Sequence, residues 1–163
     1  MGTMQYDVKS VHNTVSGVAV GYRTRLKGVL ISPSTAVTFN TTFCNNVNQS
    51  GTYAIAGSTT CTVTIANNGL SNGDRVYLDF TSGGSAQDQT YVVSNVTTNT
   101  FTVTTANLTE TGNVTMYPEI LAEFDCSNGT AFYTLIPGEG ILAQDGIYVG
   151  IPNVAITTTL FYG

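Results

Sequence analysis

Charged residues make up only 9% of this 163-residue sequence, and most of its polar residues are Thr, Asn and Ser. Lys, Glu and Arg form the exposed faces of solvated helices, so a chain this poor in them has little from which to build such helices. The 28 threonines and the many valines are β-branched and fit a pleated, half-buried surface. The composition therefore predicts an all-β fold.

The charge balance argues against two classes of partner. Five Lys and Arg residues stand against ten Asp and Glu residues, which gives a net charge of −5. So few cations cannot form a groove that follows a phosphate backbone, and we expect no nucleic-acid binding. No apolar run reaches the length of roughly 18 residues that a membrane helix needs, so we expect no membrane insertion. The first 14 residues also lack the apolar centre of a secretion signal.

The two ends of the chain share one style of sequence. Apolar runs such as residues 17–22, 26–31 and 147–151 are separated by turns that contain Pro and Gly, and Val37 and Phe39 repeat at a spacing of two. These segments predict an antiparallel β-sandwich, jelly-roll-like, built from residues 1–48 and 117–163. The sandwich would be the assembly domain.

The middle of the chain differs, because it alternates Thr, Val and Asn densely and residues 52–116 contain no Pro. Five short strands are expected, at 60–65, 75–80, 90–96, 100–105 and 112–116, joined by tight links. Such a meander predicts a small β-barrel or sandwich domain, residues 49–116, inserted in the loop after Cys44. We expect its exposed loop tips at Asn68, Asn72, Ser85 and Asp88.

The residues that could carry catalysis or bind a metal do not form a recognisable set. His12 is the only histidine and has no accompanying nucleophile motif. The turn at 137–140 lacks the Lys-Ser/Thr pair of a phosphate loop, and no calcium-loop motif occurs. The carboxylates are read as turn and surface residues. We therefore predict no catalytic, cofactor-binding or metal-binding residues, no cofactor and no enzyme activity.

Three cysteines, Cys44, Cys61 and Cys126, lie far apart and form no CxxC pair. This spacing is not typical of a disulfide framework or a zinc site, so we expect three small buried thiols. A bridge between Cys44 and Cys126 stays open, because both would lie in the outer domain.

One charge pattern suggests a contact surface. Arg23, Arg25 and Lys27 alternate, and on a strand they would share a face as a cationic stripe. That stripe is either a solvated strand face or an interface for an acidic partner. Nine Tyr and seven Phe with few charges favour an assembly protein that buries its surface. A sugar-binding module is the other class, although the absence of Trp weakens it.

Three stretches, residues 22–28 (YRTRLKG), 133–142 (YTLIPGEGIL) and 157–163 (TTTLFYG), resemble small virion structural proteins of tailed bacteriophages, in particular those of marine cyanophages. Residues 69–76 (GLSNGDRV) and 96–103 (VTTNTFTV) are similar to a β-module found in phage structural proteins. Relatives of the outer domain often lack such an insert.

The resemblance implies a capsid decoration, or cement, protein of the virion, assembled in the host bacterial cytoplasm. Its expected partners are copies of itself, as a homotrimer, and the major capsid protein or other virion proteins. The expected contact residues are Arg23, Arg25 and Lys27 together with Leu160, Phe161 and Tyr162 of the closing strand. The alternative is a tail-side component, such as a fibre, adaptor or baseplate element, or a carbohydrate- or receptor-binding module.

Overall fold

The structure is a computed structural model that describes residues 8–152 and 155–163. Every regular element in the described residues is a β-strand, and every strand pairing for which a register is defined is antiparallel. The all-β antiparallel fold predicted from composition is confirmed. In the described residues there is no apolar helix of membrane-spanning length.

The chain divides into two compact units. The outer unit contains residues up to Asn46 and residues from Leu121 onward, and the insert runs from Val47 to Ile120. The expected insert was residues 49–116. Its chain enters and leaves through strands that begin at Gln49 and end at Tyr117.

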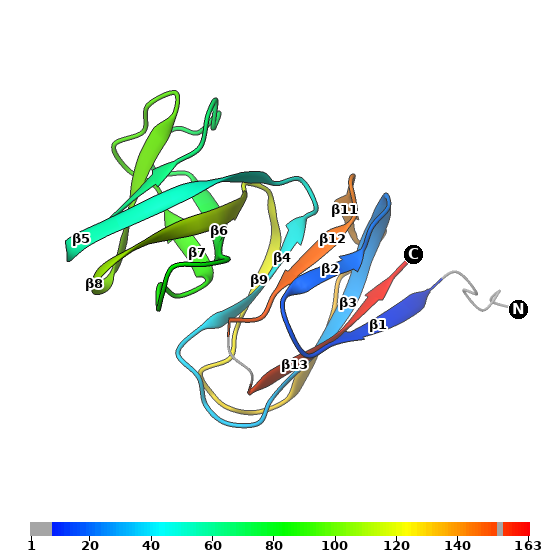
Figure 1. Cartoon of the computed structure of the whole chain (residues 1–163). Coiled ribbons are helices and arrows are strands. Elements are labelled where there is room, and N and C mark those ends of the chain that lie inside the picture. The colour runs from blue at the N-terminus through cyan, green and yellow to red at the C-terminus, as the bar shows by residue number, and fades with distance from the viewer. Residues whose placement is uncertain (1–7, 153–154) are drawn as a thin grey trace, which may run out of the picture. The chain divides into compact units, whose positions relative to one another are not determined.

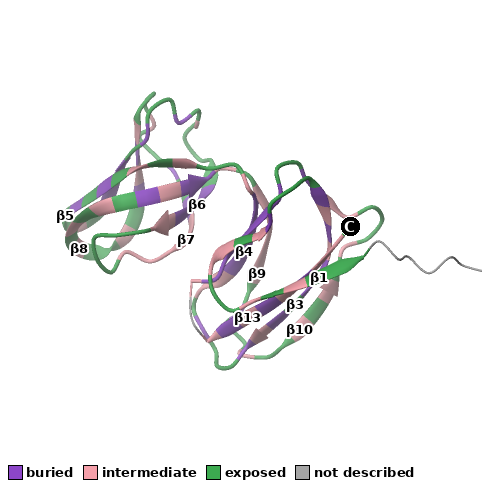
Figure 2. Ribbon diagram, turned by 45° about the vertical axis from the view of Figure 1, so that its right-hand side comes forward, coloured by how far each residue is buried: buried purple, intermediate pink, exposed green. Residues whose placement is uncertain are grey.

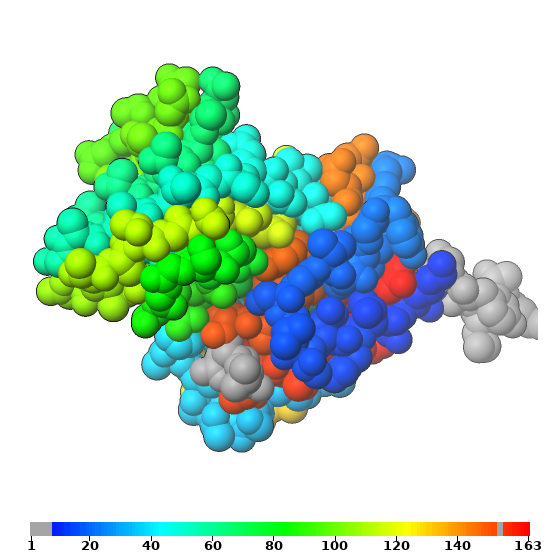
Figure 3. Space-filling model, in the orientation of Figure 1, coloured from blue at the N-terminus to red at the C-terminus, as the bar shows by residue number. Residues whose placement is uncertain are grey.

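The first sheet of the outer unit is formed mainly by strands from the two ends of the chain (Figure 1). Its order is β1-β13-β3-β10, and β11 also pairs with β3. The five strands are β1 (Lys9–Asn13), β3 (Thr24–Pro33), β10 (Phe132–Leu135), β11 (Ile141–Ala143) and β13 (Ile156–Tyr162). Figure 3 shows the N-terminal segment, in blue, beside the red C-terminal strand, as the β1–β13 pairing requires.

The second sheet of the outer unit has the order β2-β12-β4-β9. Its strands are β2 (Gly17–Val20), β4 (Asn40–Asn45), β9 (Ile120–Asp125) and β12 (Ile147–Gly150). Residues 34–39, expected to begin a strand through Val37 and Phe39, form no strand, and pairing begins only at Asn40. Val37 is nevertheless buried, so its apolar side chain fills the core from a loop.

The two sheets share one apolar core, which makes the outer unit a sandwich. Buried side chains from the first sheet, including Val29, Ile31 and Leu160, join Phe43 and Val149 of the second sheet in a single cluster. Alternation of side chains across each strand puts these residues inside and their neighbours outside. Burial alternates accordingly along β3 and β13 (Figure 2).

The insert is one four-stranded sheet with the order β5-β8-β6-β7. Its strands are β5 (Gln49–Thr64), β6 (Arg75–Phe80), β7 (Gln89–Val92) and β8 (Thr100–Tyr117). The segments expected as separate strands at 100–105 and 112–116 are joined in β8. In the described residues the sheet is open and not the closed barrel that was one expectation, because β5 and β7 lie at opposite edges.

A bend lets this single sheet enclose its own core. The register of β5 against β8 shifts twice between Ala56 and Thr60, and Gly57 takes a φ of 62°, which few other residues adopt. Side chains from both halves of β5, Tyr53 before the bend and Val63 after it, are therefore buried in the same core. The ends of the strand approach closely, because a Cβ at Gly51 would overlap the Thr64 carbonyl oxygen.

Candidate functional site

The outer face of the first sheet presents apolar side chains to solvent. Leu30 lies between buried Val29 and Ile31 and therefore points away from the core. The register places Leu30 beside Tyr133, which is 53% exposed, and Leu135 is 65% exposed two residues further along β10. Phe161 of β13 completes the surface, because its ring meets that of Tyr133 edge to face. We call Leu30, Tyr133, Leu135 and Phe161 the apolar face.

Cations border the apolar face. Arg25 lies between buried Thr24 and Leu26, so it points outward, and its Nη1 donates to the Gly140 carbonyl at 3.3 Å. Lys27 lies where the register between β3 and β13 shifts. Gly28 pairs with Phe161 and Leu26 pairs with Tyr162, so Lys27 between them has no partner residue in β13. The five strands of this sheet contain Lys9, Arg25 and Lys27 but no carboxylate. Of the predicted stripe, Arg25 and Lys27 lie in β3.

Arg23, the third predicted residue of the stripe, lies just before β3. Its side chain is exposed, and Nε donates to the Gln144 amide oxygen at 3.1 Å. Lys9, Tyr22, Arg23 and Tyr162 line a small pocket of about 210 Å³. Tyr162 also packs against the core of the outer unit.

The closing strand provides fewer contact residues than expected. Leu160 is 0% exposed and belongs to the core, so it cannot touch a partner, and its assignment as a contact residue is wrong. Alternation explains this, because Phe161 points outward and Leu160 must point inward. Tyr162 is half-buried against Tyr22, with ring centroids 6.4 Å apart. A hydrogen bond with Tyr22 raises the pKa of the Tyr162 hydroxyl.

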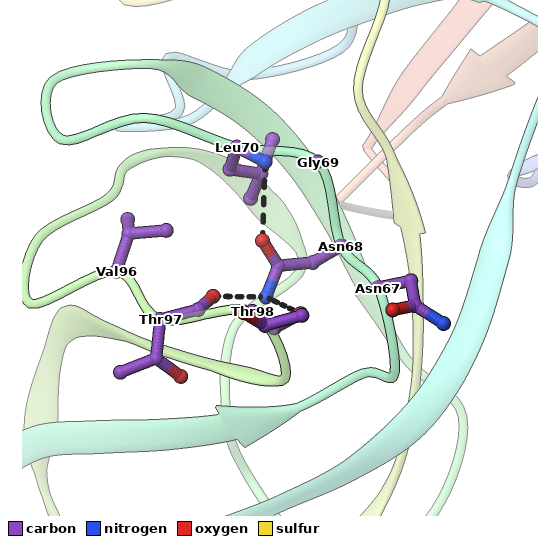
Figure 4. A pocket seen from close by; sticks show the side chains of 7 residues that line it. All are labelled: Asn67, Asn68, Gly69, Leu70, Val96, Thr97 and Thr98. Atoms are coloured by element: carbon purple, nitrogen blue, oxygen red, sulfur yellow. Dashed lines mark hydrogen bonds between the residues drawn. The ribbon is translucent and has the colours of Figure 1, made fainter.

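Asn68, expected as an exposed loop tip of the insert, is 4% exposed. Its amide nitrogen donates to the carbonyls of Thr97 and Thr98, at 2.9 and 3.2 Å, and its amide oxygen accepts from the Leu70 N–H at 3.1 Å (Figure 4). The expectation was wrong because the Asn67-Asn68-Gly69 turn folds this side chain against a second loop. Asn68 ties two loops together.

The other three residues expected at exposed loop tips differ in how far they are exposed. Asn72 is exposed, and its amide oxygen accepts from the Val96 N–H at 2.9 Å. Ser85 is exposed, as expected. Asp88 is only partly exposed, so it is not a loop tip; its Oδ1 accepts from the Phe80 N–H at 2.7 Å. Burial raises the pKa of Asp88 to about 6.

Glu110 organises the loop that carries Ser85, a role that the sequence did not indicate. Its two carboxylate oxygens accept from the backbone N–H groups of Ser85 and Ala86, both at 2.7 Å, and Oε1 also accepts from the Tyr53 hydroxyl. These hydrogen bonds lower the pKa of Glu110. Their partners are 24 to 57 residues away in sequence, so no local motif marks them.

The two larger pockets offer little for ligand recognition. One, of about 540 Å³, is lined by residues 67–70 and 96–98 of the insert (Figure 4). Its most polar buried side chain, Asn68, already uses both its amide nitrogen and its amide oxygen within the protein. The other, of about 560 Å³, includes Asp125, whose two carboxylate oxygens accept from Ser127. Both arrangements stabilise turns.

The three cysteines lie in the interior, and His12 lies on the surface. Cys44, Cys61 and Cys126 are free and buried, so the open Cys44–Cys126 pairing is not formed. Burial raises the pKa of the Cys44 thiol, and that of Cys61 to about 11, so neither is a ready nucleophile. His12 is exposed, with Nδ1 3.0 Å from the Thr159 hydroxyl. Among the described residues no three His, Cys, Asp or Glu side chains gather as a metal site.

Comparisons with known proteins add little. No protein-family model and no curated protein sequence matches the chain. Among solved structures, the chain is similar to the endosialidase of phage phi92, with a TM-score of 0.32 and 21% sequence identity. That likeness covers 79% of this chain and 20% of that protein. A likeness of this size carries no inference about function.

Proposed function

We propose that this chain is a non-enzymatic structural protein of a tailed-phage virion, and specifically a capsid decoration protein. The observation that carries the proposal is the apolar face with its border of cations. Contiguous exposed apolar surface on a soluble domain marks an interaction site. Here it lies on a five-stranded sheet and in a chain with few charges, a combination that suits permanent burial against neighbouring subunits.

The mechanism follows from the sheet. Leu30, Tyr133 and Leu135 would lose their contact with water on assembly, and aromatic side chains supply much of the energy of such interfaces. Arg25 and Lys27 would set orientation by pairing with acidic groups of the partner. A stable attachment needs about 800 Å² per partner, so residues around the apolar face must also take part. The resemblance of residues 22–28, 133–142 and 157–163 to phage virion proteins involves these same strands.

The absence of an enzymatic role is part of the proposal. It is supported by buried thiols with raised pKa values and by carboxylates, such as Glu110 and Asp125, that accept hydrogen bonds from nearby backbone groups. The virion would be the protein's location, and the major capsid protein or another virion protein its partner. Assembly would take place in the host cytoplasm.

The test is the copy number in purified virions, measured by quantitative mass spectrometry, together with co-sedimentation of the purified protein with empty heads. A decoration protein is present in many copies and binds heads. A Tyr133→Ser/Leu135→Ser variant, which removes apolar surface without touching the core, should lose that binding, and Thr62→Ser on the insert should keep it. A few copies per particle, with no binding to heads, would contradict the decoration role and indicate a tail-side component.

A further inference from the structure

The charges of this chain are distributed unevenly between its two units. Four of its five cations, Lys9, Arg23, Arg25 and Lys27, lie within residues 9–27 of the outer unit. The insert, residues 47–120, has five carboxylates against the single cation Arg75, a net charge of −4. The cationic border of the apolar face is therefore the exception on an acidic protein.

This distribution argues against one way of covering the apolar face. In a two-fold symmetric pairing, each residue of the face would meet the same surface on the partner. Arg25 and Lys27 of one copy would then lie near Arg25 and Lys27 of the other, and the strands themselves carry no carboxylate. Exposed Glu139, in the turn next to Gly140, offsets only part of this positive charge. Like charges brought together at an interface are unfavourable, so face-to-face pairing is disfavoured.

An acidic partner is the complementary occupant, and the insert of a second copy, with its net charge of −4, is acidic. Asp79 lies in β6, and Asp88 lies just before β7 on the neighbouring part of the same sheet. Asp88 accepts a hydrogen bond from the N–H of Phe80, the residue after Asp79, so the two acidic residues lie close together. Burial raises the pKa of Asp88, and the charge of Asp79 raises it further. Glu119, after β8, is exposed and adds to the negative charge of the insert.

We propose that the apolar face of one copy binds the acidic insert of a second copy, in a head-to-tail contact directed by Arg25 and Lys27. The inference rests on the proposed assembly function and names the partner of the same surface. Because the two contacting surfaces differ, the contact is heterologous, and such contacts close into rings or extend into filaments. The apolar side chains supply affinity, while the charges select the insert over a second apolar face.

The first experiment is sedimentation velocity of the full chain over a range of concentrations, without phage particles. We expect association that weakens between roughly 20 mM and 500 mM salt, because salt screens exposed charges. An Arg25→Gln/Lys27→Gln variant should associate roughly tenfold more weakly, since its directing charges are gone. Thr35→Glu/Thr38→Glu changes the net charge by the same amount on exposed loop residues and should associate normally.

A charge swap gives the sharper result. A variant with a reversed face, Arg25→Glu/Lys27→Glu, and one with a reversed insert, Asp79→Lys/Glu119→Lys, should each remain monomeric alone. Mixed in equal amounts they should associate, because each face then meets an insert of opposite charge. A monomeric wild-type chain, salt-independent association, or a mixture that stays monomeric would overturn the proposal. Binding to heads is measured separately, so it can persist when self-association fails, and the two proposals are distinguishable.

Discussion

Tyr133 and Phe161 meet edge to face above Gly28, with ring centroids 5.7 Å apart and ring planes at 89°. Gly28 is the β3 partner of Phe161, and a Cβ at this position would lie 3.5 Å from the Tyr133 hydroxyl. The two rings from the neighbouring strands thus cover the strand position that has no side chain. The contact joins two of the four members of the apolar face, so it fixes the shape that a partner would meet.

A double-mutant cycle with Tyr133→Ala and Phe161→Ala should show a coupling of roughly 0.5–1.5 kcal/mol in the free energy of unfolding, the usual range for aromatic pairs. Urea unfolding of the four proteins, followed by circular dichroism, measures it. The pair Tyr133→Ala and Thr157→Ala, on the same sheet without a ring contact, is the control and should be additive. Additivity of the first pair as well would show that the rings do not stabilise each other.

Gly51→Ala should destabilise the insert by about 3 kcal/mol, because the new Cβ would overlap the Thr64 carbonyl oxygen and the backbone there must move. The bent β5–β8 pair leaves no space at this point. Ser50→Ala, at the adjacent exposed position, should change stability by less than about 0.5 kcal/mol. Urea unfolding midpoints compare the two variants, and an equally mild effect would mean that the ends of β5 do not meet.

The alternation of apolar and polar residues in the sequence predicted several of the strands that pack on the core of the insert. Cys61 and Val63 alternate with exposed residues in the second half of β5, as a half-buried strand should. In β6, Val76 and Leu78 lie in the core of the insert, but Tyr77 between them is buried as well. The patterns did not predict that β5 would extend back to Gln49 or that β8 would cross residues 106–111. Those segments carry mostly Thr, Ser, Gly and Ala, with few large apolar residues. They are strands because they pair with each other along a bent two-stranded ribbon.

Asn68→Ala should lower the stability of the insert by roughly 2–3 kcal/mol, since it leaves the Leu70 N–H and the Thr97 carbonyl without their side-chain partner. The Thr98 carbonyl keeps the backbone N–H of residue 68 as a donor. Asn68→Asp keeps the acceptor but loses both donors, and should also destabilise. Thr98→Ala, which keeps the backbone carbonyl that Asn68 uses, is the control. Amide hydrogen exchange at Leu70 should accelerate in Asn68→Ala; unchanged exchange would show that the two loops are held by other contacts.

The contact surface was predicted in part. Alternation predicted that Arg25 and Lys27 share a face, and both residues lie in β3, but the register shifts beside Lys27, so the shared face stays a prediction. It also implied that Leu160 and Phe161 point in opposite directions, so only one of them could belong to a surface. The apolar side chains at Leu30 and Leu135 join the face through a pairing between segments more than 100 residues apart, and one sequence carries no signal for that register.

The three cysteines should not react with a thiol reagent in the native protein at pH 8. Each is at most 1% exposed, and burial raises the pKa of Cys44 and Cys61, which suppresses the thiolate. In denaturant, all three should react. Ellman's reagent measures both states on protein purified without reductant. One reactive thiol after denaturation, in place of three, would show that two cysteines had formed a disulfide.

Asp88→Asn should stabilise the insert at pH 7. The carboxyl has a pKa of about 6 in the folded protein, above its ordinary value of 3.8, so the folded state binds the proton more tightly than the unfolded state. Asp88 therefore makes the wild-type protein less stable as pH rises from about 4 to about 6. Asparagine keeps an oxygen that can accept from the Phe80 N–H but never acquires the charge.

Urea unfolding at pH 4.5 and pH 7 separates this effect from a general gain in stability. Asp88→Asn should raise the midpoint at pH 7 more than at pH 4.5. Glu110→Gln is the contrasting variant, because a lowered carboxyl pKa stabilises the folded state above the unfolded pKa and this stability is lost as pH falls. It should therefore destabilise the insert at pH 7. An equal shift of the Asp88→Asn midpoint at both pH values would contradict the assignment, because only a change in charge makes the effect depend on pH.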